Sequence, residues 1–283
     1  MSESTWAGAS GAKWARNQAR TDAQLGPLSD GALRALELRE GDRVLDVGCG
    51  TGQTLVQLRE LVGPKGWVIG LDISPPMLEG ARARISGKGY DNVELLLGDA
   101  SKLQPSAPVD AIFSRFGVMF FDDSVAAFQN LRGALRPSGC LSFVCWQALE
   151  WNAWALEPIQ AVREVVPDAA LPDLLREGEP GPFRFGDERY VEEVVTSAGF
   201  SDVQITPERR EMILGGARTL EEAVEFALEI GPAARMIADG DSELIPAVRQ
   251  SLERAFARRL TDRGVIYEAA TYVVTARAPS AGG

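Results

Sequence analysis

Short apolar segments alternate with segments of helical periodicity through the first half of the chain. The apolar segments predict five strands, at residues 44–47, 67–71, 93–97, 109–113 and 141–145. Between them, apolar residues recur at helical spacing at residues 55–62, 77–85 and 125–135. This alternation indicates βαβ units and a parallel sheet, whose buried strands are nearly all apolar.

Turn-forming residues mark several ends of the predicted helices. Gly63-Pro64 is expected to end the helix that begins near Gln53. Ser74 is a candidate N-cap for a helix whose first residue is Pro75, a position that does not need an N–H donor. Residues 136–139 predict a turn before the fifth strand.

The pattern changes after Trp146. Residues 147–186 contain several prolines without clear periodicity, which is typical of an insertion or lid. A helix at residues 187–198 and a strand at 203–205 are then expected to resume the fold. Residues 217–262 are strongly helical in composition, and residues 265–276 predict a closing strand.

These patterns predict one α/β fold, a Rossmann-like sheet with helical cap insertions, divided into six sections. The predicted sections are an N-terminal helical lid segment (1–40), a core (41–146), an aromatic insertion or lid (147–186), the core continued (187–216), a helical cap (217–262), and a closing strand and tail (263–283).

The strongest local signal is the string Val44-Leu-Asp-Val-Gly-Cys-Gly-Thr-Gly52, in which an apolar strand runs into three alternate glycines and then a helix. Glycine permits the sharp turn and lets a ligand lie against the backbone. The spacing is GxGxG rather than the GxGxxG of dinucleotide sites, and an acid, Asp46, precedes the first glycine. A carboxylate there would repel a pyrophosphate and suits a cationic ligand without phosphate, such as S-adenosylmethionine (SAM).

Two further acids follow at the ends of successive strands. Asp72 ends the second predicted strand, where a carboxylate can accept both ribose hydroxyls of an adenosine. Asp99, in Gly98-Asp-Ala100, ends the third and can read the adenine amino group. Because the carboxyl ends of parallel strands meet at one edge, these acids are expected to lie in line with the glycine turn.

These residues, with the strand that begins at Asp110, resemble class I SAM-dependent methyltransferases, and most of all the small-molecule branch related to ubiquinone/menaquinone biosynthesis. The resemblance implies a seven-stranded, mostly parallel sheet with an antiparallel last strand. It implies SAM contacts at Gly48, Gly50, Gly52, Asp72, Ile73, Asp99, Ala100 and Ser114. Asp46, Cys49, Thr51, Met77, Gly98 and Arg115 complete the predicted cofactor site.

The methyl acceptor is expected beyond the carboxyl ends of strands four and five. The residues predicted to line its site are mostly aromatic: Trp14, Phe116, Met119, Trp146, Trp151, Asn152 and Trp154. The tryptophans are open to a second interpretation, in which they pack the insertion's own core. Arg115 is likewise open to two interpretations, a partner for an acceptor carboxylate or a structural ion pair. Trp6 and Trp14 either close over the cofactor as a lid or pack as ordinary helix residues.

Composition excludes several other classes of function. The net charge is −11, which disfavours nucleic acid and anionic membranes as partners. The chain has no histidine, so there is no His metal ligand, triad or general base, and we expect no metal. Three cysteines without CxxC spacing, and no signal-peptide or transmembrane pattern, predict a cytoplasmic protein.

The sequence therefore predicts an enzyme that transfers a methyl group from SAM to an O, N or C centre of a small, apolar or aromatic molecule. The sequence identifies no catalytic base, so a carboxylate, a tyrosine, water or the acceptor itself would have to take up any proton. One alternative is a non-catalytic SAM-binding sensor or scaffold. An NAD-dependent oxidoreductase is a further alternative, against which the GxGxG spacing argues.

Overall fold

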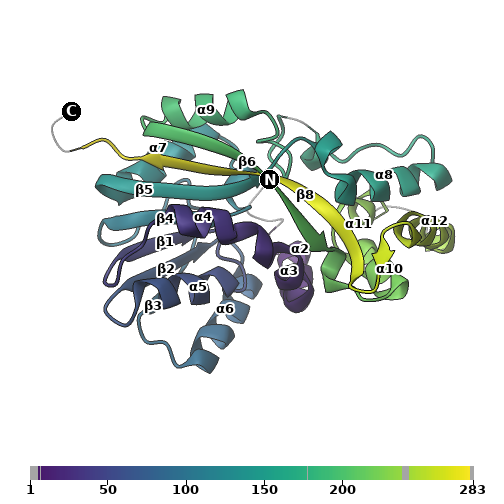
Figure 1. The fold of residues 1–283 in the computed structure, drawn as a ribbon, viewed down its shortest axis with the longest axis horizontal. Helices are drawn as coiled ribbons and strands as arrows, with labels where there is room; N and C mark the ends of the chain where they lie inside the picture. Colours follow the sequence, from purple (N-terminus) through teal and green to yellow (C-terminus); the bar gives the residue numbers. More distant parts are fainter. Residues whose placement is uncertain (1–5, 7, 177, 238–241, 281–283) are drawn as a thin grey trace.

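A seven-stranded sheet forms the centre of the protein in the computed structural model, which describes residues 6, 8–176, 178–237 and 242–280. In spatial order the strands are β3 (Val93–Leu97), β2 (Trp67–Asp72), β1 (Arg43–Val47), β4 (Val109–Arg115), β5 (Leu135–Trp146), β8 (Gly264–Arg277) and β6 (Ser201–Ile213) (Figure 1). The first five are parallel, and β8 runs antiparallel to both β5 and β6. The predicted Rossmann-like sheet with an antiparallel last strand is confirmed.

Helices follow the strands as the βαβ pattern requires. They are α5 (Gln53–Val62), α6 (Pro75–Lys88), α7 (Ser124–Ala134) and α9 (Glu188–Ser197), while α4 (Asp30–Ala35) precedes β1. Helix α5 contacts β1 and β2, α6 contacts β2 and β3, and α9 contacts β6. The predicted end of α5 at Gly63 is confirmed, because Gly63 is its C-cap with φ +68°. A layer of buried strand and helix side chains then joins the sheet to these helices.

Four helices gather beyond one end of the sheet, beside the long strands β6 and β8 (Figure 1). They are α8 (Ala153–Val165), α10 (Leu220–Glu229), α11 (Pro232–Met236) and α12 (Ile245–Ala257). Helix α8 packs against α11 and α12, and α10 packs against both. We call these four helices the helical group. Beside this group, Ile213 of β6 pairs with Ile266 of β8.

Two short helices, α2 (Ala9–Arg16) and α3 (Gln18–Leu25), precede α4 in the chain. Helix α2 contacts α6, and α3 contacts the 3-10 turn at Leu214–Gly216. The other short elements are 3-10 turns at Gly26–Ser29, Val118–Phe120, Leu149–Trp151, Asp173–Leu175 and Ser242–Leu244, and the two-residue strand β7 (Leu260–Thr261). Among the described residues, no helix combines the length and the apolarity that crossing a bilayer requires.

Three expectations about local structure are corrected. The insertion after Trp146 is not irregular throughout, because α8 forms there and holds Pro158 inside the helix. The strand predicted at residues 203–205 extends over Ser201–Ile213, since its alternation of half-buried and exposed residues weakened the apolar signal. Helix α6 does begin at Pro75, but the Ser74 side chain makes no capping hydrogen bond.

The predicted turn at residues 136–139 lies within the bounds of β5 as an irregularity. Val109 pairs with Leu135 and Ala111 pairs with Cys140, so the four intervening residues form no pair with β4. Ser138 there takes a left-handed conformation, with φ +62°. From Cys140 onward β5 is buried and regular as far as Trp146.

Candidate active site

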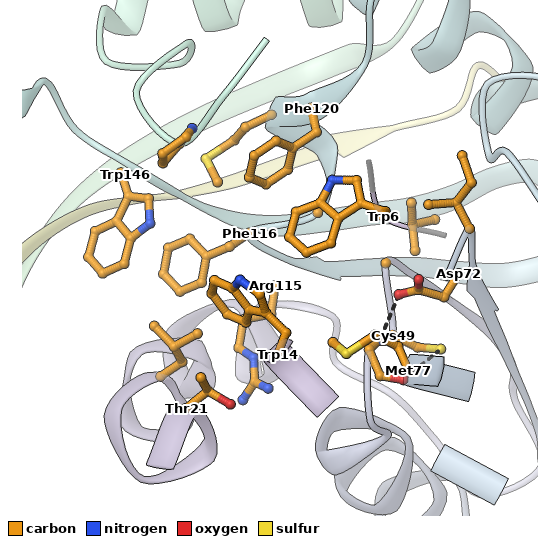
Figure 2. A pocket seen from close by; sticks show the side chains of 18 of the residues that line it. Trp6, Trp14, Thr21, Cys49, Asp72, Met77, Arg115, Phe116, Phe120 and Trp146 are labelled. Carbon is orange, nitrogen blue, oxygen red and sulfur yellow. Dashed lines mark hydrogen bonds between the residues drawn. The ribbon is translucent and has the colours of Figure 1, made fainter. Parts of the chain in front are cut away.

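One cavity of about 790 Å³ extends from the glycine turn to the helical group. It lies at the edge of the sheet where β1, β2, β4 and β5 end, as expected for an open parallel sheet. Figure 2 shows Asp72, Cys49 and Met77 at one end and Phe116 and Trp146 at the other, with Trp6 and Trp14 between them. The cavity therefore has a polar end and an aromatic end.

The glycine turn forms the floor of the polar end. Gly48 and Gly50 have φ values of +70° and +56°, which side-chain-bearing residues rarely adopt. A Cβ atom on Gly50 would lie 3.1 Å from Met77 Cε, and one on Gly48 would lie 3.0 Å from Gly117 Cα. The turn is fixed to the next strand by the Gly48 N–H, which donates to the Leu71 carbonyl at 2.8 Å.

Asp72 closes the turn from the neighbouring strand. Its two carboxylate oxygens accept hydrogen bonds from the Gly50 N–H at 2.8 Å and the Ser74 N–H at 2.9 Å. Burial raises the pKa of Asp72, and the backbone N–H donors at Ser74, Gly50 and Ile73 oppose that shift. Each oxygen can accept a further bond, so the carboxylate can hold hydroxyl groups in the cavity while keeping the turn in place.

Asp99 lies at the end of β3 on the same cavity wall. One of its oxygens accepts from the Ser101 N–H at 2.9 Å, and Lys102 Nζ lies 3.2 Å from the other. Burial by itself would raise the pKa of Asp99, but the Ser101 donors and the Lys102 ammonium outweigh it and lower the pKa. Asp99 is therefore held ionised, with its neighbours Gly98 and Ala100 also lining the cavity.

Asp46, Gly52 and Ser114 do not line the cavity and instead support the turn from behind. The Asp46 carboxylate is fully buried and accepts from Thr54 Oγ1, and burial raises its pKa to about 7. Gly52 packs against α6, where an added Cβ would meet Ala81. Ser114 donates to the Val47 carbonyl at 2.8 Å, which joins β4 to β1. These three residues were predicted as cofactor contacts, and the structure places them behind the cavity wall.

Arg115 lines the cavity with its guanidinium already paired. It donates to Gln53 Oε1, and its Nη2 lies 3.8 Å from Asp22 Oδ1 on α3. Asp22 also binds Arg84 on α6 at 2.5 Å. Of the two interpretations of Arg115, the structure shows the ion pair. This pair attaches the N-terminal helices to the core of the site.

The aromatic end is built from stacked rings. Phe116 and Trp146 lie nearly parallel, with ring centroids 4.3 Å apart and an interplanar angle of 11° (Figure 2). The Trp154 ring lies 4.6 Å from Trp146, and the Phe183 ring lies 6.2 Å from Trp154. All four line the cavity together with Met119. Phe116 holds its ring there from a left-handed backbone, with φ +57°.

Trp151 and Asn152, which were predicted to line the acceptor site, do not line this cavity. Trp151 is 60% exposed and packs its ring under the Arg209 guanidinium. Asn152 is fully buried but structural: its Oδ1 accepts from the Trp154 indole N–H at 2.9 Å and the Ala270 N–H at 3.0 Å. Residue 152 ends a 3-10 turn and α8 starts at residue 153, so Trp151 and Trp154 point to different sides.

Two aromatic residues of the N-terminal segment cover the middle of the cavity. The Trp6 ring makes edge contacts with Trp14 at 5.9 Å and with Phe120 at 5.6 Å between centroids (Figure 2). Helix α2 is pressed closely onto α6, because a Cβ on Gly11 would lie 2.2 Å from Ser74 Oγ. The two tryptophans therefore lie over the space between the polar and aromatic ends.

Comparisons with known proteins agree with this geometry. Residues 38–168 match a family model described as a methyltransferase domain. The chain carries a class I SAM-dependent methyltransferase domain.

Two curated relatives and one solved structure illustrate the likeness. Nocamycin O-methyltransferase of Saccharothrix syringae is 28% identical over 75% of this chain and 82% of its own length. The ubiquinone/menaquinone biosynthesis C-methyltransferase UbiE of Coxiella burnetii is 32% identical over 51% of this chain, and the match spans only 57% of the relative. The structure of a putative methyltransferase from Bacillus halodurans covers 89% of this chain and all of its own, with a TM-score of 0.57 and 18% identity, and shares the fold.

The cavity of this methyltransferase also includes residues that the sequence did not single out. They come from the N-terminal helices, the segment after α8, and helices α10 and α11: Thr21, Asp22, Gln24, Leu25, Leu175, Pro182, Phe183, Phe226, Ile230, Pro232 and Arg235. Most are ordinary apolar residues, which carry no local sign of ligand contact. The one usable signal is Gly231-Pro232, a turn that starts a helix and exposes its first residues to the cavity.

Proposed function

We propose that this methyltransferase transfers the methyl group of SAM to a small organic acceptor held at the aromatic end of the cavity. The observation that supports this most strongly is that the glycine turn and the stacked rings line one continuous space. A volume of about 790 Å³ is in the upper part of the range for ligand pockets, roughly 300–1,000 Å³. Such a space suits a nucleoside cofactor and a second small molecule side by side.

The polar end has the features that SAM requires. Gly48 and Gly50 line this space with backbone alone, and Cys49, Thr51 and Met77 lie around it. We assign the ribose hydroxyls to Asp72, with Ile73 beside the nucleoside, and the adenine amino group to Asp99, with Gly98 and Ala100. Asp46, Gly52, Ser114 and Arg115 hold the turn and the strand ends in position rather than contacting the cofactor.

For this reaction, the protein mainly has to align SAM with the acceptor. SAM supplies a methyl group on a positively charged sulfonium, and transfer is an in-line displacement by an acceptor lone pair. Phe116 and Trp146 present ring faces that can flank the acceptor, and aromatic faces also favour a nearby cation. Trp6, Trp14 and Phe120 cover the space between the two ends and exclude water from it.

The aromatic end offers no general base among the described residues that line it. Phe116, Met119, Trp146, Trp154 and Phe183 cannot accept a proton at neutral pH. The ionisable groups of the cavity come from the strand ends, from Asp122 and Asp123 after the Val118–Phe120 turn, and from the N-terminal helices and α11. Because none of them belongs to the stacked rings, we infer that the acceptor reaches the site with its reacting lone pair already free, as an anion or a neutral amine.

The surrounding segments are assigned supporting roles in the same proposal. The N-terminal segment to residue 40 acts as a lid, fixed by the ion pair between Asp22 and Arg115. The insertion at 147–186 and the cap at 217–262 supply the acceptor walls, while 41–146, 187–216 and the closing strand 263–283 form the scaffold. The named activities of the relatives, an O-methyltransferase and a C-methyltransferase, support a small-molecule acceptor. A cytoplasmic location and the lack of nucleic-acid partners stay predictions.

Two measurements test this function in sequence. Calorimetric titration with S-adenosylhomocysteine (SAH) should show binding by the wild type and none by Gly50→Arg. Gly87→Arg is the matched control, because Gly87 is exposed on α6 and a Cβ added there would meet no atom within 4 Å, so SAH binding should persist. Incubation of a small-molecule extract with methyl-labelled SAM should then give labelled product. Binding of SAH without any labelled product from acceptor-rich extracts would favour the sensor or scaffold alternative.

A further inference from the structure

Three cationic side chains of the described residues line the cavity, and they differ in their partners. Lys102 lies 3.2 Å from Asp99, and Arg115 lies 3.8 Å from Asp22. Arg235, on α11, forms no hydrogen bond or ion pair with any residue that the structure describes. Arg235 is therefore the cavity cation that pairs with no carboxylate among the described residues.

The surroundings of Arg235 make that charge costly. The side chain is half-buried, and burial is the cause that lowers its pKa. A guanidinium stays protonated at neutral pH even so, because its ordinary pKa lies far above 7. A partly desolvated charge with no partner destabilises a protein, and an anion that enters the cavity relieves this cost.

The position of Arg235 places it on the acceptor side. Helix α11 packs against α8, which carries Trp154 and Pro158 into the same cavity. The neighbours of Arg235 along the cavity wall are apolar, among them Ile230, Pro232 and Ala233. The glycine turn and Asp72, in contrast, come from the opposite, sheet side of the cavity.

We propose that Arg235 binds the carboxylate of an apolar, aromatic acid, which fixes the substrate class of this methyltransferase. The inference rests on the proposed function. A planar carboxylate matches the two parallel N–H donors of a guanidinium, and the stacked rings hold the aromatic body. One arginine balances one negative charge, whereas a phosphate dianion would need further donors, and the lining residues of α11 beside Arg235 are apolar.

An acid enters the cavity at neutral pH already ionised, so the anchoring carboxylate needs no proton acceptor from the protein. The reacting centre of the acceptor supplies its own lone pair. The cavity then contributes one anchoring cation and a set of ring faces. Arg235 is a binding residue in this scheme and takes no part in bond making.

The test uses the full chain saturated with SAH and two probes of equal shape, the naphthoate anion and neutral naphthamide. Calorimetry should show that the wild type binds naphthoate at least about tenfold more tightly than naphthamide. Arg235→Met should bring the two affinities within about twofold of each other, and Arg235→Lys should keep part of the preference. Arg258→Met, at an exposed position after α12, should behave as the wild type.

The outcomes separate this inference from the proposed function. SAH affinity should change by less than about twofold in Arg235→Met, which shows that the variant keeps its fold and cofactor site. Equal affinity of the wild type for both probes, or no binding of either while SAH binds, overturns the role of Arg235. Failure of the wild type to bind SAH overturns the proposed function and this inference with it.

Discussion

Phe116 stacks on Trp146 with ring centroids 4.3 Å apart, and it does so from a backbone conformation that disfavours any side chain with a Cβ. Its φ of +57° turns the chain at the end of β4, just before Gly117 packs against Gly48 of the glycine turn. The same strained residue thus connects the polar and aromatic ends of the cavity. Strain of this kind is common where a ligand must be held.

Removing the Phe116 ring separates its two effects. Phe116→Ala and Phe116→Gly both lose the stacking partner of Trp146, so both should lose methyl transfer while still binding SAH. Phe116→Gly should be the more stable of the two by about 1 kcal/mol, because glycine accepts the left-handed backbone without strain. Urea unfolding of the two variants measures this difference. An alanine variant as stable as the glycine variant would show that the conformation is not strained.

Asp72 should be the most sensitive acid of the cofactor site. In Asp72→Asn an amide NH₂ group replaces one carboxylate oxygen. This group accepts no hydrogen bonds, so it can take the place of that oxygen neither toward the backbone N–H nor toward a ribose hydroxyl donor. Bonds to charged groups contribute about 1.5–3 kcal/mol, so SAH affinity should fall by roughly ten- to hundredfold. Calorimetry measures the loss. Asp91→Asn, at an exposed position, is the control and should keep wild-type affinity.

The buried carboxyl of Asp46 should make stability fall as pH rises. Burial raises its pKa from 3.8 to about 7 in the folded state, so between these values the folded protein holds a proton that the unfolded chain releases. Folding is therefore favoured at pH 5 and loses that advantage as pH approaches and passes 7. Relative to Asp46→Asn, which does not titrate, the wild type should lose about 2 kcal/mol between pH 5 and pH 7.

Urea unfolding of wild type and Asp46→Asn at several pH values measures this effect. The one Asp46 oxygen without a hydrogen-bond partner among the described residues is consistent with a carboxyl that keeps its proton. Parallel stability profiles for the two proteins over this range would contradict the shift.

The sequence was sufficient to predict those parts of the site that lie at the ends of the parallel strands. The glycine turn, Asp72 and Asp99 all lie at strand ends, where parallel pairing brings them to one edge whatever the rest of the chain does. The aromatic end was predicted less well. Trp146 and Trp154 line it, but the start of α8 at residue 153, which decides where Trp151 points, has no sequence signal strong enough to locate.

The residues from the N-terminal helices and the helical group could not be predicted for a different reason. Phe226, Ile230 and Arg235 reach the cavity only because α10 packs on α11, and α11 packs beside α8, which is far from them in sequence. Their spacing is that of any amphipathic helix. The sequence around a single arginine among apolar residues does not indicate that its charge pairs with none of the described residues. Tertiary packing, rather than local pattern, decides these contacts.

The ion pair between Asp22 and Arg115 should govern how firmly the N-terminal lid is held. Asp22→Asn leaves Arg84 and Arg115 without this carboxylate in a mostly buried position, which should cost about 3 kcal/mol of stability. It should also speed proteolysis near residues 6–25. Adding Arg115→Gln should restore part of the loss, because one unpaired charge is then removed. Asp168→Asn, at an exposed site, should leave both measurements unchanged.

A structure of the protein with SAH bound will show whether cofactor and acceptor share one cavity. The ribose hydroxyls should bind Asp72, and the adenine should lie near Asp99. The sulfur should point past Phe116 toward the stacked rings and Arg235. A nucleoside bound elsewhere, or a sulfur turned away from the aromatic end, would contradict this arrangement.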